Sequence, residues 1–97
     1  MYAALVAEDR RLVILRLLVE SANYSANEYL LQQGLRAFGH EVGHDLLRTE
    51  LAWLEEQNLL DLGDVGGVRV AKLRERGVDV AQGATTAPGV KRPRPGE

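Results

Sequence analysis

Residues 40–44 read His-Glu-Val-Gly-His, which matches the H-E-x-x-H pattern of zinc peptidases. In those enzymes both histidines lie on one face of a helix and bind zinc, while the glutamate activates the metal-bound water. That arrangement needs a continuous helix, yet Gly39 precedes this motif and Gly43 interrupts it. We therefore expect a chance match, with His40 in a turn and His44 at the start of a helix.

A zinc site would also need a third protein ligand. The extended metzincin motif has a glycine and a histidine where this chain has Leu47 and Glu50. The chain has no cysteine, which excludes disulfides and thiolate-bound metals. We expect the protein to have no enzymatic activity, no metal site and no cofactor. A zinc peptidase is the least favoured of the alternatives.

The apolar pattern predicts three helices before residue 58. The first is apolar except for one stripe, formed by Asp9, Arg16 and Glu20. The second follows a capping box of Ser25 and Glu28 and ends near Phe38; its inward residues are Leu31, Leu35 and Phe38. The third extends from about Gly43 to Gln57, and its inward residues are Leu47, Leu51 and Leu54.

The periodicity changes after residue 58 and predicts a β-hairpin. Residues 59–65 and 68–73 flank Gly66-Gly67, a dipeptide that suits a tight turn. Residues 74–83 predict a short closing helix. The chain is therefore expected to be mainly α with a small β-hairpin, an α+β fold. Three helices, a C-terminal wing and a short closing helix match a winged helix-turn-helix.

The 97 residues divide into a domain, residues 1–83, and a tail, residues 84–97. All three prolines lie in the tail, which has few large apolar side chains, so we expect it to be disordered. Three basic residues and one acidic residue in the tail leave 9 basic and 13 acidic residues in the domain. No apolar run approaches the ~18–20 residues that span a bilayer. We expect a cytoplasmic protein that has no membrane contact.

In a winged helix the third helix enters the major groove of DNA. The candidate DNA-binding residues are His44, Arg48 and Thr49 on that helix, Arg69 and Lys72 on the hairpin, and Lys91, Arg92 and Arg94 in the tail. Arg48 has the chemistry to read a guanine edge, and the tail could anchor phosphates. The third helix nevertheless has one arginine against four acidic residues. Because cations supply most non-specific DNA affinity, a protein-interaction module is the alternative.

Two features leave apolar surface for a homodimer or another protein partner. The first helix is apolar around most of its circumference, and Val13 lies on its polar side. Trp53, the only tryptophan, lies beside the main apolar face of the third helix. It is expected either to pack in the core or to anchor a homodimer.

Several segments also resemble a family of small winged-helix proteins of Mu-like bacteriophages and prophages, some of which are described as similar to ArsR-type transcriptional regulators. The resemblance covers nearly the whole chain and is most specific in RTELAWLEEQ, residues 48–57, and RERGVDVAQG, residues 74–83. It implies a DNA-binding regulator in the bacterial host cell. Because this chain has no cysteine, the resemblance does not extend to the cysteine metal sites of some ArsR-type sensors.

Overall fold

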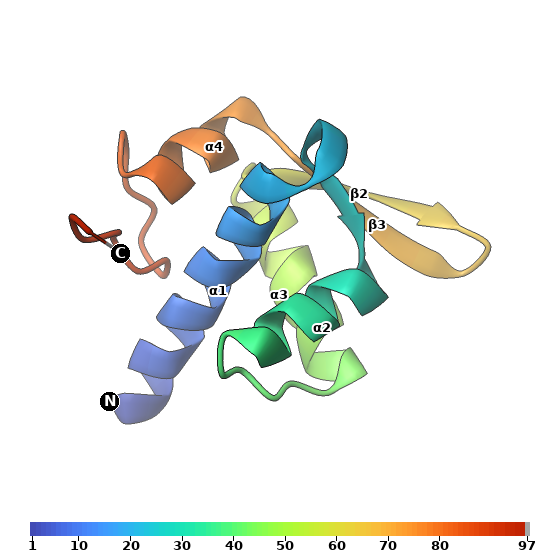
Figure 1. The fold of residues 1–97 in the computed structure, drawn as a ribbon, viewed down its shortest axis with the longest axis horizontal. Coiled ribbons are helices and arrows are strands. Elements are labelled where there is room, and N and C mark those ends of the chain that lie inside the picture. The colour runs from blue at the N-terminus through green and yellow to red at the C-terminus, as the bar shows by residue number, and fades with distance from the viewer. Residues whose placement is uncertain (97) are drawn as a thin grey trace.

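A computed structural model describes residues 1–96 of the chain. Its elements are α1 (Tyr2–Glu20), the 3₁₀ turn η1 (Ala22–Tyr24), β1 (Ser25–Asn27), α2 (Glu28–Ala37), α3 (His44–Glu56), β2 (Leu60–Val65), β3 (Val68–Leu73) and α4 (Glu75–Gln82). The strands form an antiparallel sheet in the order β1–β3–β2. The predicted α+β class is therefore confirmed. Figure 1 shows the β2–β3 hairpin projecting on one side of α1, and the C-terminal residues lying on the other side.

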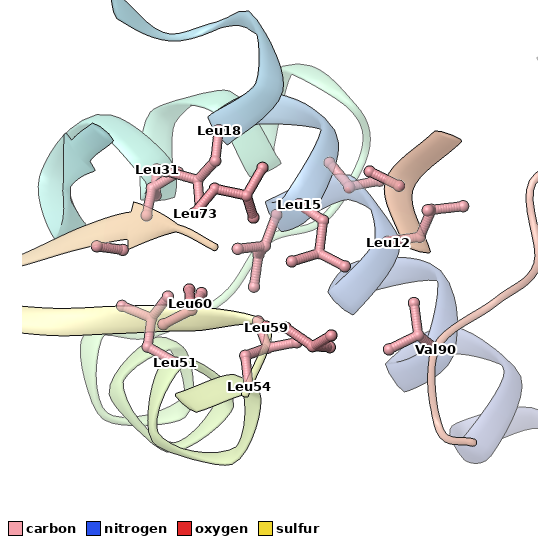
Figure 2. Close-up of a cluster of buried hydrophobic side chains, with 14 of the residues drawn as sticks. Leu12, Leu15, Leu18, Leu31, Leu51, Leu54, Leu59, Leu60, Leu73 and Val90 are labelled. Atoms are coloured by element: carbon pink, nitrogen blue, oxygen red, sulfur yellow. The ribbon is translucent and has the colours of Figure 1, made fainter. Parts of the chain in front are cut away.

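The core is built mainly from leucines of α1, α3 and the strands. On α1 the fully buried side chains are Leu12, Ile14, Leu15 and Leu18. Leu47, Leu51 and Leu54 of α3 are fully buried, as predicted. Figure 2 shows leucines from α1, α3 and both hairpin strands meeting in one cluster, with Val90 beside α1.

Strand β1 replaces the predicted capping box. Ser25 is the first residue of this strand and pairs with Lys72, whereas Asn27 caps α2 by accepting a hydrogen bond from the Leu30 backbone N–H. Three residues are too few for a visible alternation, so the strand had no signal in the sequence. The capping box of Ser25 and Glu28 was therefore wrong, and Glu28 has a different role.

The ends and buried residues of α2 and α3 agree closely with the prediction, with one exception. Leu31 and Leu35 of α2 are buried as predicted, but Phe38 is 66% exposed. The helix ends at Ala37, so Phe38 is the C-cap, and the positive φ of Gly39 turns the chain away. Helix α3 has Gly43 as its N-cap and ends before Asn58, whose φ is also positive.

The hairpin has the predicted turn. Both Gly66 and Gly67 have positive φ, and the Gly67 backbone N–H donates to Asp64 Oδ1. On β3, Ala71 and Leu73 are buried, while Lys72 on the opposite face is exposed. Ala71 and Leu73 therefore contribute to the core, whereas Lys72 faces away from it.

The tail differs from the disorder that its composition predicts. Ala87 and Val90 are buried in the core cluster. The Lys91 backbone N–H donates to Glu8 O, and Arg11 Nη1 donates to Gly89 O. Two apolar side chains are enough here because α1 provides the surface on which they pack. No helix in residues 1–96 combines the length and hydropathy required to cross a membrane.

Substitution of Gly89 tests whether the tail is packed in solution. Gly89 has a φ of +94°, and a Cβ there would lie 2.8 Å from the Trp53 ring. We expect Gly89→Ala to lower the free energy of unfolding by about 1–3 kcal/mol, because the ring has to move and the backbone is strained. Urea unfolding followed by Trp53 fluorescence measures the effect.

Gly96→Ala is the matched control. Gly96 also has positive φ, but its Cβ would have no atom within 4 Å. If both variants were as stable as the parent chain, the packed position of the tail would be contradicted.

Candidate functional site

The His-Glu-Val-Gly-His motif does not form one helical face. His40 lies in the connection before α3, and its Nε2 is 2.7 Å from Asp9 Oδ2 on α1. His44 is the first residue of α3, and its Nε2 contacts Glu28 Oε1 on α2. The two rings thus have different carboxylate partners. Within residues 1–96 no three histidine, aspartate or glutamate side chains are grouped closely enough to hold a metal ion.

The side chain of Glu28 is the centre of a buried polar cluster. Glu28 is the first residue of α2 and is 1% exposed. Arg48 donates from Nε to Oε1 over 2.8 Å and from Nη2 to Oε2 over 2.9 Å. The Arg69 backbone N–H donates to Oε2 over 2.5 Å, and His44 contacts Oε1. One carboxylate therefore joins α2, α3 and β3.

The cluster extends from Glu28 to the turn of the hairpin and to an exposed aromatic ring. Arg48 Nη2 also donates to Gly67 O over 3.0 Å. The ring centroids of Tyr29 and His44 are 5.2 Å apart, with the rings tilted by 53°. Glu28, Tyr29, His44, Arg48 and Arg69 are called the Glu28 cluster below.

The hydrogen bonds of the cluster hold Glu28 in its charged form. The bidentate bond from Arg48 lowers the pKa of Glu28 far below its ordinary value of 4.5, although burial acts in the opposite direction. The backbone N–H of Arg69 and the ring of His44 lower it further. The same bond raises the pKa of Arg48. At neutral pH the cluster therefore contains a fixed ion pair.

Three of the predicted DNA-binding residues meet in this cluster, and the others lie elsewhere. His44, Arg48 and Arg69 come together around Glu28. Thr49 is exposed beside them on α3, and its Oγ1 donates to Asp45 O. Lys72 lies on the opposite face of β3 from Arg69.

The C-terminal segment, which contains Lys91, Arg92 and Arg94, lies on the other side of α1 from the hairpin (Figure 1). Lys91 Nζ lies 3.5 Å from Asp9 Oδ1, so this cation is held on α1. Arg92 and Arg94 are exposed. The tail therefore does not extend the surface around the Glu28 cluster.

Sequence reasoning missed Glu28 and Tyr29. Glu28 matched a capping pattern, which gave it a local role. Its real partners are 16, 20 and 41 positions away along the chain, at residues 44, 48 and 69. No spacing rule for one helix or hairpin connects residues this far apart.

A second buried carboxylate organises the other side of α3. Glu50 is 3% exposed and accepts from Arg10 Nε over 2.8 Å and from Arg11 Nε over 3.0 Å. The Arg11 guanidinium also lies 4.2 Å from the centroid of the Trp53 ring. Trp53 packs against the core, so the core-packing interpretation of this residue is confirmed.

Known proteins with a similar sequence come from a phage and a bacterium. The chain is 48% identical over 91 residues to an uncharacterized protein, gp26, of Escherichia phage Mu, which covers 94% of this chain and 94% of that protein. It is 45% identical over 76 residues to an uncharacterized protein of Haemophilus influenzae, covering 77% of this chain and 74% of that protein. No protein-family profile matches the chain.

Substitution of Glu28 tests the cluster. Glu28→Gln removes the negative charge and leaves the guanidinium of Arg48 with a neutral partner. We expect the variant to lose about 1.5–3 kcal/mol of unfolding free energy at pH 7, the usual worth of hydrogen bonds to a charged group. Urea unfolding monitored by circular dichroism measures this loss.

The loss should also depend on pH. The lowered pKa of Glu28 in the folded chain means that its stabilisation is complete above the ordinary value of 4.5 and declines as the pH falls below it. The difference between parent and variant should therefore narrow between pH 5 and about pH 3. Glu41→Gln, which alters the exposed Arg36–Glu41 pair, is the control and should change stability little. A Glu28→Gln variant as stable as the Glu41→Gln variant at pH 7 would contradict the role of the cluster.

Proposed function

We propose that this chain, which belongs to the family of the phage Mu protein gp26, is a phage-encoded winged-helix protein that binds DNA. The order of elements supports this fold: a helix, a short strand, two helices joined by a turn, and a hairpin. In this proposal α2 and α3 form the helix-turn-helix and the β2–β3 hairpin is the wing. The resemblance to a family of Mu-like phage proteins, some of which are described as similar to ArsR-type regulators, suggests a role in transcription.

The Glu28 cluster is the observation that carries the proposal. It fixes Arg48 of α3 and Arg69 of the hairpin beside each other, so the first turns of α3 and the wing present one surface. The side chains of Arg48 and Arg69 remain 35% and 40% exposed. His44 and Thr49 border them on α3. Cations and hydroxyls in such an arrangement suit contacts with phosphates.

The internal bonds of Arg48 decide which contact it can make. Its Nε and Nη2 atoms are engaged by Glu28, and Nη2 also donates to Gly67 O. A bidentate contact with guanine would use two adjacent nitrogens of the guanidinium, which Arg48 could offer only by breaking one of these bonds. We therefore propose that Arg48 binds a phosphate through Nη1, in place of the guanine contact expected from sequence.

The surface of the first turns of α3 is less acidic than the charge count of the helix indicates. Glu50 is buried and shared between Arg10 and Arg11, so it adds no negative charge to the surface. Glu55 and Glu56 lie in the last turn of α3, away from its first turns. Asp45 is the acidic residue in the first turn. Repulsion of phosphates by the leading half of α3 is therefore small.

A second candidate function is a protein-interaction module. The last turn of α3 exposes Glu55 and Glu56, and the exposed residues of β2 include Asp61 and Asp64. These acidic residues would suit a basic protein partner better than DNA. We propose no enzymatic activity for the His40–His44 motif, because its two rings contact different carboxylates.

Fluorescence anisotropy with a labelled mixed-sequence DNA duplex tests the first proposal. We expect the full chain to bind at low salt and to lose affinity steeply as the salt concentration rises, because bound phosphates release counterions. Arg69→Gln should weaken binding to every sequence alike and lower the slope against salt by about one. The backbone N–H of Arg69 would still reach Glu28, so the cluster remains intact.

Arg74→Gln is the matched control. Arg74 and Arg69 each lie near an aspartate of β2, at 3.8 Å and 3.9 Å, but Arg74 follows the other end of β3. It should leave binding unchanged. Absence of binding even at low salt would contradict the DNA proposal and favour the protein-interaction candidate. Equal losses in both variants would show that the contact surface is not the one built on the Glu28 cluster.

A further inference from the structure

The side chains of α3 include few that could read a DNA base. A helix in the major groove reads sequence through side chains that make paired hydrogen bonds to a base edge, and arginine, lysine, asparagine and glutamine make such pairs. Within His44–Glu56 a single residue, Arg48, belongs to these four types. Whether α3 reads sequence therefore depends on Arg48 and on the shorter polar side chains beside it.

Two polar side chains in the first two turns of α3 are bonded to Glu28. Arg48 donates to this carboxylate from Nε and Nη2, and Nη2 also donates to Gly67 O. The Nε2 atom of His44 contacts Glu28 Oε1, and the ring of His44 lies beside that of Tyr29. Because Glu28 is 1% exposed, each bond transferred to a base would leave part of a buried carboxylate unsatisfied. These bonds therefore keep Arg48 and His44 from making paired contacts with bases.

The neighbouring exposed residues of α3 offer no hydrogen-bond donor in their place. Thr49 Oγ1 donates to Asp45 O over 3.0 Å, so the hydroxyl proton is used within the helix. The carboxylate of Asp45 is exposed, but it only accepts hydrogen bonds and has the same sign of charge as the phosphates. Leu46 is 41% exposed and has no polar atom in its side chain. The surface of these turns is therefore poorly suited to reading sequence.

The same surface does offer single cationic donors. Arg48 has a further nitrogen, Nη1, on a side chain that is 35% exposed. The side chain of Arg69 is 40% exposed, and its Nε lies 3.9 Å from Asp64 Oδ2, which is longer than a hydrogen bond. Cations of this kind suit the oxygens of phosphates, and contacts with phosphates contain no direct information about sequence.

We propose that the ligand of the Glu28 cluster is duplex DNA of any sequence, bound through its phosphates without recognition of an operator. This inference rests on the proposed function and names its substrate class. The bonds that hold α3 and the hairpin together are the same bonds that occupy the base-reading atoms of Arg48. A role in transcription would then depend on how much DNA the protein covers, since it would not select one site.

Selection from a library of random-sequence duplexes tests this inference on the full chain. Bound duplexes are recovered, amplified and sequenced over several rounds, and we expect no motif to be enriched. A single paired contact with a base discriminates at least about fivefold against the wrong base. Two unrelated mixed-sequence duplexes of equal length should therefore compete for the chain at concentrations that agree within about fivefold.

The outcomes separate this inference from the proposed function. Enrichment of a motif, or a preference between the two duplexes greater than about fivefold, would overturn sequence-independent binding and leave DNA binding intact. Absence of binding to any duplex at low salt would overturn both.

Substitution of Asp45 gives a second test that leaves the Glu28 cluster in place. Asp45→Ala removes the carboxylate from the first turn of α3 and keeps the carbonyl to which Thr49 donates. We expect the affinity for both duplexes at low salt to rise by the same factor, about threefold, the effect of one unit charge at about 6 Å in water. Circular dichroism confirms that the variant is folded.

Glu56→Ala is the matched control for Asp45→Ala. Glu56 is also an exposed carboxylate of α3, but it lies in the last turn, so its removal should change the affinity little. If Asp45 instead accepts a hydrogen bond from a base, Asp45→Ala would weaken binding to one duplex and not to the other. That result would overturn sequence-independent binding.

Discussion

The arrangement of α2, α3 and the hairpin depends on the buried carboxylate of Glu28. A charged group removed from water is tolerated only where partners satisfy it, and Glu28 draws its partners from three elements. The backbone N–H of Arg69 must therefore lie at the start of α2, and the guanidinium of Arg48 must lie between α3 and Gly67. The leucine core brings these elements together, but hydrophobic packing is not directional. The charged hydrogen bonds of Glu28 are directional, and they fix how these elements are oriented relative to one another.

Two buried carboxylates also change the meaning of the charge count. Arg10 and Arg11 look like free cations in the sequence, yet they form bonds to Glu50. Arg48 looks like the one cation of an acidic helix, yet it is bound to Glu28. Net charge summed over a helix thus overstates the acidity of the surface of α3 and equally overstates the freedom of its arginine. The charge that a surface offers to a partner is the charge that remains after the internal ion pairs have been subtracted.

Much of the fold could be predicted from periodicity and turn chemistry, because these are local properties. The inward leucines of α3 and the glycines of the hairpin turn were predicted correctly, as was the kinship with proteins of Mu-like phages. The three-residue strand β1 was too short to show alternation. The packed tail was missed because composition does not reveal that Val90 has a surface on α1 to cover. The Glu28 cluster was missed because its bonds connect distant residues.

The Glu28 cluster and the tail lie on different sides of the molecule. The cluster joins α3 to the hairpin, whereas the tail packs against α1 through Val90 and through the bond from Arg11 to Gly89 O (Figure 1). The cations of the tail therefore add nothing to the surface around Arg48 and Arg69. A contact with phosphates at this surface would depend on the few cations that the cluster itself holds in place.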